Sequence, residues 1–106
     1  MFAQFSLHAN LLKALAAQGL VQPTPVQAGA IPPALARRDL MVSAETGSGK
    51  TVAFLLPALQ QLLQTERARD SGTQVLILTP TRELARQIHK QAQKLCEFTA
   101  LRSGLI

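Results

Sequence analysis

The 106-residue sequence has little cysteine and few aromatic residues. It contains one cysteine, four phenylalanines, two histidines, and neither tryptophan nor tyrosine. A single cysteine excludes a disulfide framework within the chain. Cys96 and the two histidines, His8 and His89, are too few for an ordinary structural zinc site, so we interpret all three as surface or packing residues. We expect a reducing, cytoplasmic setting, because nothing in the sequence depends on disulfide formation.

Long apolar runs are also missing, although apolar residues make up an ordinary 47% of the chain. Lys13, Arg37, Pro57 and Gln60 interrupt the apolar stretches within about ten residues, whereas a membrane-spanning helix needs about 20. The sequence therefore predicts a globular protein with no membrane partner.

Acidic residues are scarce relative to basic ones. Six Asp and Glu stand against eleven Lys and Arg, which gives a formal net charge of +5. This excess favours a polyanionic partner or ligand, although charge alone is weak support. The length suits one small domain or a part of a larger one.

Four segments show the apolar spacing of helices. Thr24 followed three residues later by Gln27 is the pattern of a capping box, which predicts a helix start at that point. Pro32-Pro33 predicts a kink or an early stop in the helix that follows, and Pro57 predicts a bend. The predicted helices cover residues 9–18, 25–35, 50–65 and 81–98.

Short apolar runs between these helices read as buried strands. The runs cover residues 39–44, 75–78 and 101–106. Strands that alternate with helices of this length predict an α/β fold, built from parallel βαβ units with flanking helices. Three strands are few for a parallel sheet, and the last run has no closing helix. We therefore expect an incomplete domain.

The segment 44–51 reads Ala-Glu-Thr-Gly-Ser-Gly-Lys-Thr and lies between a predicted strand and a predicted helix, which is the context of a P-loop. Gly47 and Gly49 allow backbone angles that turn successive N–H groups toward a phosphate. The helix N-terminus adds a positive end. Lys50 would supply a cation for the outer phosphates, and the Thr51 hydroxyl would hold Mg²⁺.

Two features of this loop leave an alternative open. Ala44 stands where the general pattern has glycine, and a plain glycine-rich turn would also fit. Glu45 would repel phosphate, so we expect its side chain to point away. The Gly-Lys-Thr run in this position favours a phosphate site. We assign nucleotide binding to Thr46, Gly47, Ser48, Gly49, Lys50 and Thr51.

Three segments together resemble one family, the DEAD-box ATP-dependent RNA helicases. Residues 44–51 look like its variant P-loop, in which alanine in the first place is usual. Residues 19–27, Gly-Leu-Val-Gln-Pro-Thr-Pro-Val-Gln, look like its Q motif. Residues 80–85, Pro-Thr-Arg-Glu-Leu-Ala, look like its motif Ia. The resemblance runs from Phe2 to Ile106 and implies a RecA-like P-loop domain that uses ATP and Mg²⁺.

The resemblance implies that Gln27 hydrogen-bonds the adenine edge. A side-chain amide offers both a donor and an acceptor, which suits adenine. The capping role with Thr24 is compatible with this contact. The family also stacks an upstream aromatic ring on adenine, and Phe2 lies at the family spacing before Gly19, with Phe5 as the alternative.

Motif Ia contacts the RNA sugar-phosphate backbone in the family, without reading sequence. Its residues here are Pro80, Thr81, Arg82 and Glu83, where a strand end meets a helix start that favours phosphate. Arg86, Lys90 and Lys94 follow Arg82 at intervals of four residues. We interpret these three as a solvated face, although like charges at that spacing would also be relieved by a polyanion.

Several of the family's catalytic motifs are missing. The sequence has no Asp-Glu-Ala-Asp run, no Ser-Ala-Thr motif and no second RecA-like domain. We therefore predict a domain truncated before the Walker B strand, with a Q-motif region over 1–38 and the first part of the ATP-binding domain over 39–106. This describes an N-terminal fragment of an RNA helicase that is inactive alone. The alternatives are a stand-alone nucleotide- or RNA-binding module and another P-loop enzyme, such as a kinase.

Overall fold

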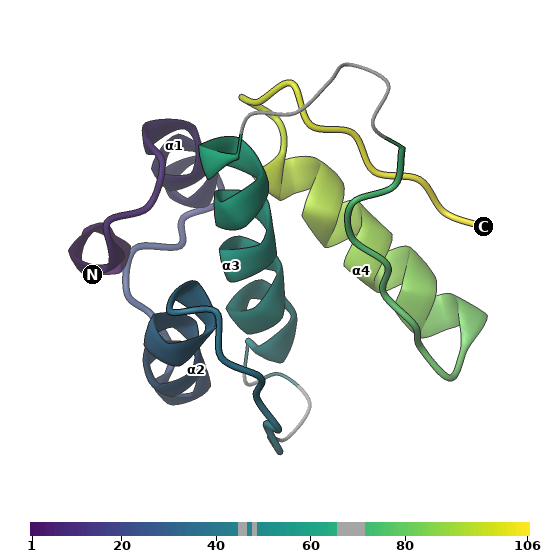
Figure 1. Cartoon of the computed structure of the whole chain (residues 1–106), viewed down its shortest axis with the longest axis horizontal. Coiled ribbons are helices and arrows are strands. Elements are labelled where there is room, and N and C mark those ends of the chain that lie inside the picture. Colours follow the sequence, from purple (N-terminus) through teal and green to yellow (C-terminus); the bar gives the residue numbers. More distant parts are fainter. Residues whose placement is uncertain (45–46, 48, 66–71) are drawn as a thin grey trace.

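A computed structural model describes residues 1–44, 47, 49–65 and 72–106 (Figure 1). A short 3-10 helix, η1, covers Phe2–Phe5 and precedes the α-helices. The α-helices of the described residues are α1 (Ala9–Ala17), α2 (Pro25–Leu35), α3 (Lys50–Gln64) and α4 (Arg82–Leu95). The helices predicted from apolar spacing are therefore confirmed, and the largest difference is that α4 ends at Leu95 rather than near Phe98.

Side chains fix the starts of α1 and α2. At α2, Thr24 and Gln27 form the predicted capping box. At α1, the His8 Nδ1 atom accepts from the backbone N–H of Asn10 at 3.1 Å, a cap that the sequence did not suggest. The His8 N–H itself donates to the Gln60 side chain of α3. This bond ties the start of α1 to the middle of α3.

Proline does not end α2 where the sequence suggested an early stop. Pro32 and Pro33 lie inside the helix, which continues to Leu35. Its C-terminal carbonyls find other partners, since the Pro32 carbonyl accepts from the Ala36 N–H at 3.1 Å. The Gln61 side chain of α3 also donates to the Ala34 carbonyl at 3.4 Å. Pro32 and Pro33 have no N–H to donate to the Ala28 and Gly29 carbonyls, and α2 continues past them while packed against α3.

The core lies between the helices. α3 packs against α2 on one side and α4 on the other, and α1 also contacts α4 (Figure 1). Every one of these helices contributes to the most deeply buried group of large side chains, which comprises Leu11, Leu15, Ile31, Leu56 and Leu95. Apolar burial of this kind is the main favourable term in folding. It fixes the position of the α3 start, which carries the glycine-rich loop.

The described residues contain no β-strand, so the parallel strands predicted over 39–44, 75–78 and 101–106 are not found. A strand forms only when its backbone groups find ladder partners. These three segments make no backbone hydrogen bonds to one another. Several of their apolar side chains are exposed, with Leu76 and Leu78 at 71% and 84%, although Leu101 packs partly against the core.

An apolar groove lies between the segment around Leu76 and the helices behind it. It encloses about 390 Å³, and its walls include Phe54 of α3 and Leu84 and Ile88 of α4. Phe54 is exposed, whereas the other large apolar residues of α3 are buried or half-buried. The sequence predicted that a sheet would pack against these helices. Among the described residues no sheet lies there, and the groove is on the side of the helices that the sheet would cover.

No helix in the described part of the chain combines the length and hydropathy needed to cross a membrane.

The different burial of two leucines gives a test of this packing. Leu56→Ala removes a side chain with no exposed surface and should cost about 2–5 kcal/mol of unfolding free energy. Leu76→Ala should change stability by less than about 0.5 kcal/mol, because the Leu76 side chain is largely solvated. Urea unfolding followed by helical circular dichroism measures both. Equal costs at the two positions would contradict the arrangement described here.

Candidate nucleotide and RNA site

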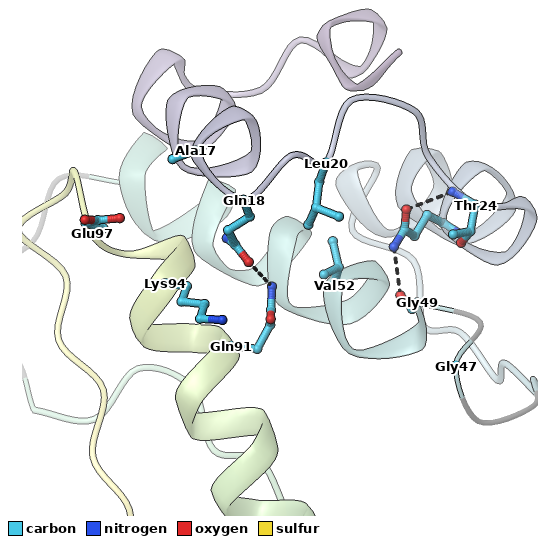
Figure 2. A pocket seen from close by; sticks show the side chains of 11 residues that line it. Ala17, Gln18, Leu20, Thr24, Gly47, Gly49, Val52, Gln91, Lys94 and Glu97 are labelled. Atoms are coloured by element: carbon cyan, nitrogen blue, oxygen red, sulfur yellow. Dashed lines mark hydrogen bonds between the residues drawn. The ribbon is translucent and has the colours of Figure 1, made fainter.

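The Gln27 side chain joins two segments that are far apart in the sequence. Its Oε1 atom accepts from the Thr24 backbone N–H at 2.9 Å, within the capping box. Its Nε2 atom donates to the Gly49 carbonyl at 3.1 Å (Figure 2). Gln27 is only 4% exposed although it is polar. Buried polar groups are stable only when hydrogen-bonded, so these contacts fix the orientation of the amide.

The Gly49 carbonyl is shared between α2 and α3. It accepts from Gln27 and also from the Ala53 N–H at 3.1 Å, which is the first hydrogen bond of α3. Gly49 is the N-cap of α3 and has φ of 85°, a left-handed conformation that favours glycine. A Cβ atom at Gly49 would overlap the Gln27 amide and approach Thr24 Oγ1 to 3.0 Å. Glycine is therefore required here for both backbone conformation and space.

After these bonds, the Gln27 amide keeps one N–H and one oxygen lone pair. A donor beside an acceptor is what the edge of an adenine base would match. The amide borders a groove of about 600 Å³, here called the Gln27 groove, whose walls include Leu20, Gly47, Gly49 and Val52 (Figure 2). This volume lies in the range of small-molecule and cofactor sites.

The start of α3 has the features of a phosphate site. Gly47 also has φ of 85°, and a Cβ atom there would meet nothing within 4 Å. The first N–H groups of a helix lack intrahelical partners, and the helix dipole favours negative charge beside them. Lys50 is exposed at this point and Thr51 is half-buried. These residues fit a triphosphate with Mg²⁺, since a threonine hydroxyl is the hard oxygen ligand that Mg²⁺ prefers.

Part of the predicted loop lies outside the described residues. Thr46 and Ser48 were assigned to nucleotide binding from the sequence, and Glu45 was expected to point away. The structure does not describe these three positions, so their roles remain predictions.

The structure places Phe2 in the core rather than in an open ring-stacking position. Phe2 is 3% exposed, and its backbone N–H donates to the Val21 carbonyl at 3.1 Å. Phe5 is the more exposed of the two rings and meets Phe2 edge to face, with centroids 6.2 Å apart. The bond to Val21 does hold η1 against the Q-motif segment.

Pro80, Thr81, Arg82 and Glu83 are all exposed at the start of α4. Thr81 is the N-cap, and its Oγ1 atom accepts from the Leu84 N–H at 3.1 Å. The Thr79 hydroxyl donates to the Thr81 carbonyl at 2.9 Å and braces the turn. One first-turn N–H, that of Leu84, is therefore taken by the Thr81 cap, while the exposed helix start still combines a positive dipole end with the exposed Arg82, which suits a phosphate contact.

Cysteine and histidine take structural positions, as expected from the sequence. Cys96 is buried in the core, and burial raises the pKa of its thiol. His89 has a buried Nδ1 atom with no hydrogen-bond partner. In the part of the chain that the structure describes, no group of three or more metal-binding side chains occurs.

Sequence comparison finds close relatives. A family model described as DEAD/DEAH box helicase matches residues 24–106. The chain is 50% identical over 105 residues to the "ATP-dependent RNA helicase SrmB" of Haemophilus influenzae, covering 99% of this chain and 24% of that protein. It is 53% identical over 105 residues to "DEAD-box ATP-dependent RNA helicase 28" of Arabidopsis thaliana, covering 99% of this chain and 13% of that protein.

Structure comparison agrees with the sequence. The crystal structure of the RNA helicase Prp28 from Chaetomium thermophilum bound to ADP matches with a TM-score of 0.81 and 42% identity, over 94% of this chain and 26% of that one. The described helices thus share the fold of RecA-like helicase domains.

The chain is a member of the DEAD/DEAH box helicase family. It spans about a quarter or less of the length of the relatives named above.

Two glycines with the same φ allow the Gln27 contact to be tested. Gly47→Ala and Gly49→Ala both place alanine in the left-handed region, which costs roughly 1–2 kcal/mol. Only at Gly49 does the new Cβ also overlap Gln27, and displacing a packed side chain costs about 1–3 kcal/mol more. We expect Gly49→Ala to be the more destabilising change in urea unfolding.

The double variant Gly49→Ala/Gln27→Ala distinguishes overlap from backbone strain. Gln27→Ala removes the amide that the new Cβ would overlap. The double variant should therefore lose less unfolding free energy than the sum of the losses of the two single variants. Strict additivity would show that Gly49 and Gln27 do not interact.

Proposed function

We propose that this chain is the nucleotide-binding and RNA-contacting part of an ATP-dependent RNA helicase. The observation that carries the proposal is the position of Gln27. Gln27 is buried, bonded to the Gly49 carbonyl of the glycine-rich loop, and borders the Gln27 groove, so a ligand in that groove would meet the amide and the loop together. Family membership and the ADP-bound state of the Prp28 structure support the same ligand class.

In this proposal the Q-motif region, residues 1–38, recognises the base of ATP. Gln27 reads the adenine edge with its remaining donor and acceptor, which a guanine edge would not match. Phe2 would stack on the base, as the family spacing indicates. Since Phe2 is buried in this structure, the ring would have to turn outward, and the more exposed Phe5 is the alternative.

The region 39–106 binds the phosphates and RNA. The backbone of residues 46–49 and the start of α3 surround the phosphate chain, and Lys50 contacts the outer phosphates. Thr51 is the residue that would hold Mg²⁺, which neutralises phosphate charge when bound. At the start of α4, the segment Pro80 to Glu83 contacts the RNA backbone without reading sequence.

The chain lacks groups that the reaction needs. Phosphoryl transfer depends on positioning and charge stabilisation, and this sequence has no acidic run to place the attacking water. Among the residues that the structure describes, segments 39–44 and 75–78 also have no strand partner. We propose that further polypeptide, such as the rest of a full-length helicase, supplies both. Alone, the 106-residue chain should release phosphate from ATP no faster than buffer, with or without RNA.

A hybrid helicase tests the proposed function in a complete protein. The chain replaces the matching segment of the Haemophilus influenzae relative, with which it shares 50% identity. The hybrid should hydrolyse ATP in an RNA-stimulated manner. Lys50→Ala should lower that rate by about a hundredfold or more, the usual loss for a charge-stabilising group.

Gln27→Ala tests base recognition in the same hybrid. Unpaired polar groups at a buried site cost about 1–3 kcal/mol, so the preference for ATP over GTP in kcat/KM should fall by about tenfold or more. Gln93→Ala, at an exposed glutamine on α4, is the matched control and should leave the preference unchanged. An unaltered preference in Gln27→Ala would refute the adenine role.

A further inference from the structure

The exposed face of α4 carries a row of cations. Arg82, Arg86 and Lys90 are all exposed and follow one another at intervals of four residues. Four residues advance about 6 Å along a helix and rotate by about 40°, so the three side chains form a gently winding stripe about 12 Å long. Buried residues such as Ile88 and Leu95 occupy the opposite face.

Acidic side chains are scarce along this stripe. Within the described residues, none of its three side chains has an ion-pair partner. The sole acid of α4 is Glu83, in the first turn, and after Arg86 the exposed positions of α4 carry only glutamine or lysine. A solvated helix face is normally stabilised by acids placed four residues from bases, and like charges at that spacing repel. The stripe therefore favours an external polyanion.

The stripe is continuous with the proposed RNA contact. Arg82 belongs to both, because it is the first residue of α4 and follows the Thr81 cap. Lys94 lies four residues after Lys90 but is not part of the exposed stripe. It lines the Gln27 groove together with Gln91 and Glu97, on the side that faces α1 (Figure 2). The free cations that follow Arg82 along the outer face are thus Arg86 and Lys90.

We infer that Arg86 and Lys90 extend the RNA-backbone track from the start of α4 along its outer face by two further helical turns. This inference rests on the proposed RNA contact at residues 80–83. The extended contact is electrostatic and reads no sequence, since the stripe offers point charges and no stacking ring. It replaces the sequence-based interpretation of Arg86 and Lys90 as a merely solvated face.

The test measures binding of the 106-residue chain to a fluorescein-labelled oligouridylate of about 15 nucleotides, by anisotropy at several salt concentrations. Arg86→Gln/Lys90→Gln should bind about tenfold more weakly at low salt. Its plot of log K against log salt should be shallower by about 1.4, or about 0.7 for each lost phosphate contact. Arg86→Lys/Lys90→Arg keeps the charges and should bind as the original chain does.

The matched control is Arg37→Gln/Arg38→Gln, which removes two exposed cations outside α4. It should leave the salt slope nearly unchanged, and circular dichroism should show equal helix content in all variants. Equal weakening by both pairs would mean a general charge effect and would overturn the inference.

Two further outcomes separate the inference from the proposed function. If Arg82→Gln abolishes binding while Arg86→Gln/Lys90→Gln has no effect, the extended track is wrong and the contact at residues 80–83 stands. If the original chain binds no RNA at any salt concentration, the inference and the proposed RNA contact both fail.

Discussion

The hydrogen bond from the Gln27 amide to the Gly49 carbonyl is the constraint on which the site depends. It joins the start of α2 to the start of α3, and the same amide accepts from Thr24 to complete the α2 cap. Two helix starts and one loop are thereby fixed by a single buried side chain. A ligand that contacts Gln27 on one side and the loop on the other would therefore meet a preorganised surface, which lowers the cost of binding.

The candidate nucleotide and RNA contacts both lie at the N-terminus of a helix. Both use a helix N-terminus after an apolar segment, with Gly49 capping α3 and Thr81 capping α4. Each helix start combines the backbone N–H groups of a first turn, the positive end of a dipole, and an adjacent cation. Because α3 and α4 also pack on each other, the same core holds both helix starts in place.

Local patterns were the part of this structure that the sequence predicted well. The capping box needs only Thr24 and Gln27 on one turn, and the apolar spacing of α3 and α4 is set within each helix. The contact between Gln27 and Gly49 spans 22 positions, and no local pattern encodes it. The His8 cap and its bond to Gln60 were missed for related reasons, since histidine is an uncommon cap and Gln60 is 52 positions away.

The predicted strands are absent from the described residues because a strand forms only when a neighbouring strand supplies backbone hydrogen bonds. The run Val75 to Leu78 has the composition of a buried strand, yet the described residues provide it with no ladder partner. The burial of Phe2 also depends on tertiary packing that sequence spacing does not reveal.

The most direct test of the central claim observes the Gln27 side-chain amide itself. In a ¹⁵N-labelled chain, the two Nε2 protons of Gln27 give assignable nuclear magnetic resonance signals. The account predicts that ATP with Mg²⁺ shifts these signals and the Gly49 backbone N–H signal together, and that GTP shifts only the latter. Signals of Gln27 that stay fixed at saturating ATP, or that move equally with GTP, would contradict it.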